Sequence, residues 1–276
     1  VLYWRRSDAL DVARPTPAIR STEIPVEAML VALTTASGRR GGLPPVARTL
    51  PQAELLHRAL IGRLGRGERV NCPVLLGTDA DGRRLAGHRH AHVLPIDLDG
   101  DGFLDHMLIH APMGLDAMAQ RAIRGLRRTH TKGADDLQVA LAASGRLDDL
   151  RRLGEPIGDG LRSLLGPART WRSITPFVAP RYVKRNGANS LIGQIAAELT
   201  SRSLPPATIT VLPFTDEAVA RPLRHHVRVR RDKAKAPPVD CGFAISLTFD
   251  KHIAGPISLG YASHYGLGLF AAVQEV

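Results

Sequence analysis

The chain has 276 residues, enough for one large domain or two small ones, and it carries a formal net charge of +11. Its 44% apolar and 23% charged residues are typical of a globular protein. Only two cysteines occur, Cys72 and Cys241, which argues against a disulfide framework or a cysteine-based zinc site. Nothing resembles a signal peptide or a run of the ~20 apolar residues that cross a bilayer, so the cytoplasm is the expected compartment.

Prolines and a Ser-Gly-Arg-Arg-Gly-Gly turn punctuate the first fifty residues, which favours a connector over 1–50 with one short apolar helix over 26–35. The chain begins at Val1, so we expect it to be a fragment or a processed form. A first domain is then expected over residues 51–165. Its predicted elements are a helix over 52–64, a hairpin of strands over 85–96 and 103–110, a helix over 115–128 and a strand over 137–143.

A second domain is expected over residues 166–276. Its order of strand, helix, strand, strand and strand is typical of an α+β ferredoxin-like domain, a fold that RNA-binding modules often use. The predicted elements are strands over 171–178, 208–212, 224–231 and 243–249 and a helix over 190–202.

The positive charge is concentrated in one part of the chain. Residues 162–236 contain fourteen Lys and Arg against four Asp and Glu, a local net charge of +10. A localised cationic surface attracts polyanions through counterion release. The clustering therefore predicts a nucleic-acid partner.

Three histidines alternate with other residues at 88–92. On a strand, His88, His90 and His92 would share one face. RNA cleavage needs a base for the 2′-hydroxyl and an acid for the 5′-oxygen, and imidazole suits both roles near neutral pH. We therefore expect these histidines to be catalytic, the alternative being hydrogen bonds within the hairpin.

The turn at 97–102 matches the front of a calcium loop, with acids at its first, third and fifth positions and glycine at its sixth. Position twelve, where a bidentate Glu belongs, is Leu108, and helical flanks are not expected. An acidic hairpin turn is thus the preferred interpretation, and no metal is assigned. His106 and His110 lie near enough in sequence to keep a metal site open as an alternative.

The segment 224–233 is basic. As a strand it would place Arg224, His226, Arg228 and Arg230 on one face, with Lys233 following. Such a face suits an RNA phosphate backbone, whereas the alternative is an exposed edge strand guarded by its charges.

A glycine-rich loop is expected at 255–270. Its glycines permit positive φ and allow backbone amides to approach phosphates. The loop lacks the Lys-Ser/Thr of a nucleotide P-loop, and no GxGxxG follows a strand, so no cofactor is expected. The residues expected to contact RNA are Gly260, Ser263, His264, Gly266 and Gly268.

The order and spacing of four segments, 87–95, 97–102, 171–178 and 255–270, resemble one family. It is the fused Cas-five/Cas-six subunit of type I-G (formerly I-U) CRISPR systems. The match covers about residues 50–276, the Cas-six-like half, and the Cas-five-like half would lie before Val1.

The resemblance implies two tandem ferredoxin-like domains and metal-independent cleavage of precursor CRISPR RNA within its repeat. It implies a catalytic histidine among His88, His90 and His92, RNA contacts from the glycine loop, and other subunits of a type I effector complex as partners. Arg181, Lys184 and Arg185 would suit the phosphate backbone.

Two further functions stay open. One is a non-catalytic subunit that holds the repeat-derived end of a guide RNA, which the basic segment and glycine loop would serve equally well. The other is a metal-dependent phosphodiesterase with His88, His90, His92 and either Asp105 or His106 as ligands.

Overall fold

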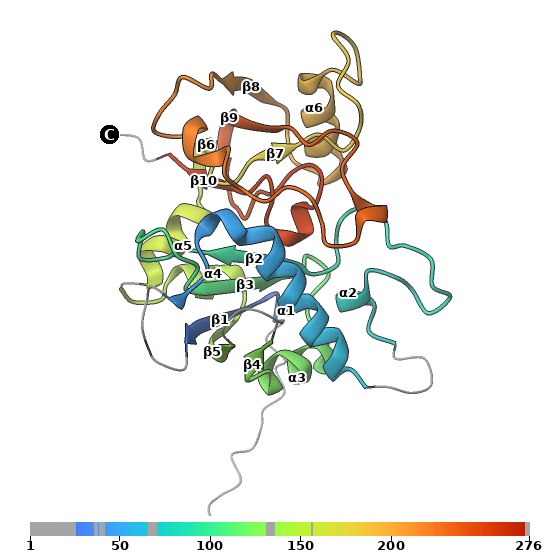
Figure 1. The fold of residues 1–276 in the computed structure, drawn as a ribbon, viewed down its shortest axis with the longest axis vertical. Helices are drawn as coiled ribbons and strands as arrows, with labels where there is room; N and C mark the ends of the chain where they lie inside the picture. Colours follow the sequence, from blue (N-terminus) through green and yellow to red (C-terminus); the bar gives the residue numbers. More distant parts are fainter. Residues whose placement is uncertain are drawn as a thin grey trace, which may run out of the picture.

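Two antiparallel sheets, each covered by helices, make up the described chain (Figure 1). The computed structural model describes residues 26–35, 38, 42–65, 71–130, 136–155 and 157–273. The α+β class with two tandem ferredoxin-like domains, expected from the sequence, is confirmed by the connectivity of both sheets. Among the described residues, no helix is long and apolar enough to span a membrane.

The first sheet has the strand order β2-β3-β1-β5-β4. Helix α1 (Thr49–Arg63) connects β1 to β2 and helix α3 (Ala117–Gly125) lies between β3 and β5, which is the βαββαβ arrangement of a ferredoxin-like domain. The strands are β1 (Ala28–Thr35), β2 (His92–Ile96), β3 (His106–His110), β4 (Arg128–Thr129) and β5 (Leu137–Gly145).

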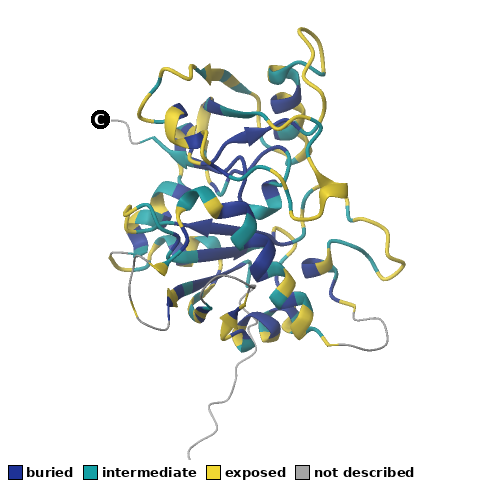
Figure 2. Cartoon of the chain, in the orientation of Figure 1, coloured by how far each residue is buried: buried dark blue, intermediate teal, exposed yellow. Residues whose placement is uncertain are grey.

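Strands β1, β2 and β3 are largely buried on both faces of this sheet, whereas β5 alternates buried residues with more exposed ones (Figure 2). On one face, Met29 and Val31 pack against α1 and α3. On the other, Ala28 and Leu30 pack with α4 (Leu147–Arg151) and α5 (Ile157–Leu165). The first sheet is therefore the centre of a three-layer unit.

Strand β1 corrects two expectations. It occupies the range predicted to be a short helix, because an apolar run buried on both faces has no alternation by which sequence could identify it as a strand. It also lies within residues 1–50, the predicted connector, yet it pairs with both β3 and β5. The first sheet therefore begins before residue 51.

The second sheet repeats the same order with β8, β9, β6 and β10. Helix α6 (Leu191–Ser201) follows the first strand, which is interrupted into β6 and β7, and a loop with a short 3-10 helix, η4 (Ser263–Tyr265), stands where a second helix would be. The strands are β6 (Ala168–Ser173), β7 (Phe177–Val178), β8 (Ala207–Leu212), β9 (Gly242–Ile253) and β10 (Phe270–Ala272).

The two domains meet through the glycine-rich loop. Leu50 of α1, Val178 of β7 and Leu267 of the loop form a small buried cluster. The remaining short elements are η2 (Val46–Arg48), α2 (Pro73–Leu76), α7 (Ala220–Leu223) and η3 (Lys233–Lys235).

Two predicted strands differ from the structure. The run predicted as 85–96 is extended only from His92, because Gly87 and His88 adopt positive φ of 75° and 52°. The segment 224–231 is irregular, and Val227 donates its amide to Ala47 in the first domain. The edge strands of the second sheet are β8 and β10, and the segment 224–231 pairs with neither of them.

Candidate active site at the histidine cluster

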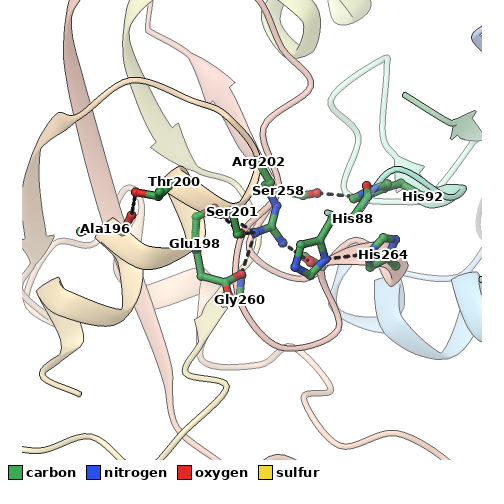
Figure 3. Close-up of polar contacts among 11 residues, drawn as sticks. His88, His92, Ala196, Glu198, Thr200, Ser201, Arg202, Ser258, Gly260 and His264 are labelled. Carbon is green, nitrogen blue, oxygen red and sulfur yellow. Dashed lines mark hydrogen bonds and ion pairs between the residues drawn. The ribbon is translucent and has the colours of Figure 1, made fainter. Parts of the chain in front are cut away.

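Four imidazoles meet where the two domains touch. Figure 3 shows three of them, those of His88, His92 and His264. The ring of His264, on η4, lies 3.9 Å from those of His90 and His92 and 5.2 Å from that of His88, measured between centroids. The predicted histidines thus do converge, although by packing of their rings around His264, stacked for His88 and His90 and tilted for His92, and not by strand alternation.

The hydrogen bonds fix how these rings share their protons. Nδ1 of His264 lies 3.3 Å from the carbonyl oxygen of Ala91, which can only accept, so this nitrogen carries a hydrogen. Nε2 of His264 then accepts, and its partner 3.0 Å away is Nδ1 of His88. His88 is therefore left with Nε2 as its lone-pair nitrogen, and Nε2 makes no hydrogen bond to a described residue.

The ring of His92 is hydrogen-bonded to the backbone of His88. Its Nε2 donates to the His88 carbonyl oxygen at 3.1 Å, and its Nδ1 accepts from the Ser258 hydroxyl at 3.2 Å. This buried ring, 6% exposed, holds the positive-φ residue His88 in place. Nδ1 of His90 is buried and has no partner among the described residues.

An ion pair at the end of α6 holds the loop that carries His264 (Figure 3). Glu198 Oε2 accepts from the Gly260 amide at 2.7 Å and from Arg202 Nη1 at 2.9 Å. Arg202 Nη2 donates to the Ser263 hydroxyl at 2.9 Å. In Figure 3 the His88 ring lies between Arg202 and His264.

Burial keeps the cluster neutral. Desolvation is the main cause that lowers the pKa of His90 to about 4 and that of His92 to about 3. The pKa values of His88 and His264 are lowered from 6.5 for the same first reason. Near neutral pH these imidazoles are unprotonated and so able to accept a proton, but the lowered pKa makes each a weaker base than a free imidazole and leaves it a poor proton donor.

A cleft of about 840 Å³ opens beside the cluster. Both domains line it, and it receives His88, His90 and His264 together with cationic and aromatic side chains. These are Arg84, Arg230, Lys235, Tyr261 and Tyr265. The arrangement can hold a polyanion against a neutral base.

The residues of the basic segment separate in the structure. Arg224 and Lys233 are exposed, whereas His226 is 5% exposed and lies in the protein interior. Arg228 Nε donates to Asp240 Oδ1 at 2.6 Å, and Arg230 Nε donates to Glu54 Oε1 at 2.6 Å. The predicted single basic face is therefore wrong, because two of its arginines take carboxylate partners and the histidine is buried.

The three loop glycines expected to contact RNA, Gly260, Gly266 and Gly268, pack against protein. A Cβ on Gly268 would lie 1.9 Å from the Leu259 oxygen, and one on Gly266 would lie 2.7 Å from Thr49 Cγ2. The amides of Gly260, Gly266 and Gly268 donate to Glu198, Ser263 and Pro176. These amides are therefore used inside the chain, contrary to the expectation that they are open to phosphates, and Ser263 is likewise buried and bonded to Arg202.

Arg181, Lys184 and Arg185 are exposed on the loop before α6. The buried Gln194 amide organises this loop: its oxygen accepts from the Arg181 amide at 3.0 Å, and its nitrogen donates to Arg181 and Asn189 carbonyls. The three basic side chains do not line the cleft, and their contacts with phosphate stay a prediction.

The ligand set of the metal alternative does not assemble. His92 pairs with His110 at one end of the β2–β3 hairpin, while His106, which pairs with Ile96, lies at the other beside Asp105. Within the described ranges, the group of acidic or imidazole ligand atoms within 4.8 Å of one another is Asp97, Asp99 and Asp105. Asp97 accepts two backbone amides, as an acidic hairpin turn would.

Sequence reasoning missed the residues that complete the site. Glu198 and Arg202 are spaced i, i+4 on a predicted helix, which was a signal for an ion pair but not for its place beside the histidines. Glu54 and His57 lie within the predicted helix over 52–64, and nothing in its pattern distinguished them.

No family model matches the chain, and no curated protein matches it. Solved structures are similar to it at low identity. The crystal structure of Cas6b is 12% identical with a TM-score of 0.39, covering 90% of this chain and 99% of that one. A Cas6 product complex is 14% identical with a TM-score of 0.39, covering 91% and 100%. Csf5, a type IV Cas6 crRNA endonuclease, is 11% identical with a TM-score of 0.40, covering 90% and 100%.

Proposed function

We propose that this chain is a CRISPR precursor RNA endoribonuclease that cuts within the repeat without a metal ion and retains its product in a type I effector complex. One observation carries the cleavage chemistry: Nδ1 of His88 is used in the hydrogen bond to His264. This leaves Nε2 of His88 as a base at the edge of a cationic cleft. The order of the four sequence segments supports the choice of CRISPR RNA.

In this reaction Nε2 of His88 takes the proton of a ribose 2′-hydroxyl. The 2′-oxygen forms a bond to phosphorus, and the bond from phosphorus to the 5′-oxygen breaks. The products are a 2′,3′-cyclic phosphate and a 5′-hydroxyl, whose proton comes from Lys235 or from a water that it orients, because the neighbouring imidazoles are neutral. Arg84 and Lys235 line the cleft and would stabilise the charge of the phosphorane.

The test is cleavage of labelled repeat RNA in excess EDTA under single-turnover conditions. We expect one cut by the parent chain, none of an RNA with a 2′-deoxyribose at the scissile nucleotide, and none by His88→Ala. His225→Ala is the matched control, because His225 is exposed and outside the cluster. Cutting of the deoxy substrate, or full activity of His88→Ala, would contradict the mechanism.

The burial of the cluster favours a second function, a non-catalytic subunit that holds guide RNA. His92 and His264 are bonded within the protein and their pKa values are lowered, as structural histidines would be. Tight binding of repeat RNA, with no cutting by the parent chain at any pH, would decide for this function.

A further inference from the structure

The cleft continues past the histidines into a second hollow of about 650 Å³, here called the lateral compartment. Glu54, His57, Arg58 and Ile61 line it from one side of α1, at the spacing that places residues on a single helix face. It shares five lining residues with the histidine cleft: His57, Leu76, Arg230, Lys235 and Tyr265. A bound chain can therefore pass from one hollow into the other.

Arg230 stands at the junction and its guanidinium is held in one orientation. Its Nε donates to Glu54 Oε1 at 2.6 Å, and its central carbon lies 4.5 Å from the centre of the Tyr265 ring. The side chains of Arg230 and Glu54 are 20% and 10% exposed. Such a planar group, fixed on one edge and on one face, loses little freedom when its terminal nitrogens bind an anion.

Charges around the junction favour an anion. The second oxygen of Glu54 accepts from the Arg231 amide at 3.1 Å, so this carboxylate is occupied on both oxygens. Asp232 is paired with Lys235 at 3.4 Å. Arg58 and Arg231 add two further cations to the lateral compartment.

We propose that Arg230 binds the phosphate adjoining the cleaved one, that the lateral compartment receives the next nucleotide of a single RNA strand, and that Glu54 positions Arg230. This inference rests on the proposed function for the identity of the strand. Arginine side chains stack on the bases of unpaired RNA, and the guanidinium of Arg230 is already held flat by the Tyr265 ring.

The experiment measures binding of an uncleavable 2′-deoxy repeat RNA whose phosphates are replaced one at a time by neutral methylphosphonates. In the parent chain one position next to the scissile phosphate should weaken binding by about ten- to a hundredfold, the range of a charged hydrogen bond. In Arg230→Ala, the methylphosphonate at that position should weaken binding no further. The steepness of log affinity against log salt concentration should fall by about 0.7. Because the readout is binding, it is independent of whether the chain cuts.

Arg121→Ala is the matched control, since Arg121 is exposed on α3 and lines neither hollow. Glu54→Gln tests the positioning role: in a variant that thermal melting shows to be folded at the assay temperature, it should weaken binding only when the sensitive phosphate is charged. If the Arg230→Ala and methylphosphonate losses multiply at every position, Arg230 does not bind that phosphate and the proposal is overturned. If Glu54→Gln weakens charged and neutral RNAs equally, Glu54 has no positioning role.

Discussion

Nδ1 of His88 lies 3.0 Å from Nε2 of His264, and the two residues are 176 positions apart in the chain. The ring of His264 sets the proton position of His88, because His264 donates its own Nδ1 hydrogen to the Ala91 oxygen and its Nε2 must then accept. The lone pair of His88 that the proposed reaction needs therefore depends on a side chain from the second domain.

His264→Ala should lower the single-turnover cleavage rate by about ten- to a hundredfold, since a lost hydrogen bond to the base misorients it. Because His264 also lines the cleft, binding of uncleavable RNA is measured beside the rate and should fall by less than the rate does. His264→Gln offers a side-chain oxygen to His88 and should recover part of the rate. Equal rates for the Ala and Gln variants would show that the contact does not orient His88.

Stability should fall in mild acid. Above pH 6.5 the buried histidines are neutral in both states, whereas below it the unfolded chain binds protons that the folded chain refuses until pH about 4. His226 is one such group, buried with neither ring nitrogen hydrogen-bonded to a described residue. His226→Phe should therefore shrink the loss of unfolding free energy between pH 7.5 and pH 5 by about 2 kcal/mol.

Denaturant titrations at the two pH values measure this difference. The exposed neighbour His225, replaced in the same way, should leave the loss as it is in the parent chain. An unchanged loss in His226→Phe would mean that this ring is protonated in the folded state.

Gly268→Ala should be strongly destabilising, by about 3 kcal/mol or more, because the new Cβ meets the Leu259 oxygen at 1.9 Å and φ is +59°. Gly187→Ala should cost only about 1 kcal/mol, since φ is +78° there but nothing lies within 4 Å. Thermal melting of the two variants checks the order, and equal melting temperatures would contradict the packing role of Gly268.

Removing either member of the Glu198–Arg202 pair should destabilise the chain by about 2–4 kcal/mol, because each side chain is mostly buried and the other would lose its partner. Glu198→Gln combined with Arg202→Met should cost less than the sum of the two single changes. Urea unfolding of the four proteins gives the coupling energy. A strictly additive result would mean that the pair does not hold the loop.

The sequence pattern was sufficient wherever an element has one buried face. The helix predicted over 190–202 is α6, begun by Ser190, whose hydroxyl accepts from the Gly193 amide at 3.0 Å. The strand over 208–212 is β8, at the sheet edge with alternating exposure. In β1 both faces are buried, so the period that separates strand from helix is absent.

The site could be predicted only in part. The pattern at 88–92 identified three of the four histidines, but Gly87 and His88 leave the extended conformation, so strand alternation gave the wrong geometry. The pairing of Arg230 with Glu54 joins residues 176 positions apart, and no local pattern contains a partner at that distance. Carboxylates distant in sequence therefore decide which basic side chains are already paired within the protein.

The packing of His88, His90 and His92 around His264 has a consequence for the order of folding. Strand β2 and the residues before it can form within the first domain, but the fourth ring arrives only when the second domain folds and its loop docks on α1 and β2. Contacts so distant in sequence form late, since the entropy of closing the loop must first be overcome. In a molecule with only its first domain folded, His264 would not yet set the proton position of His88, so the base that the proposed reaction needs would be completed only when the second domain docks.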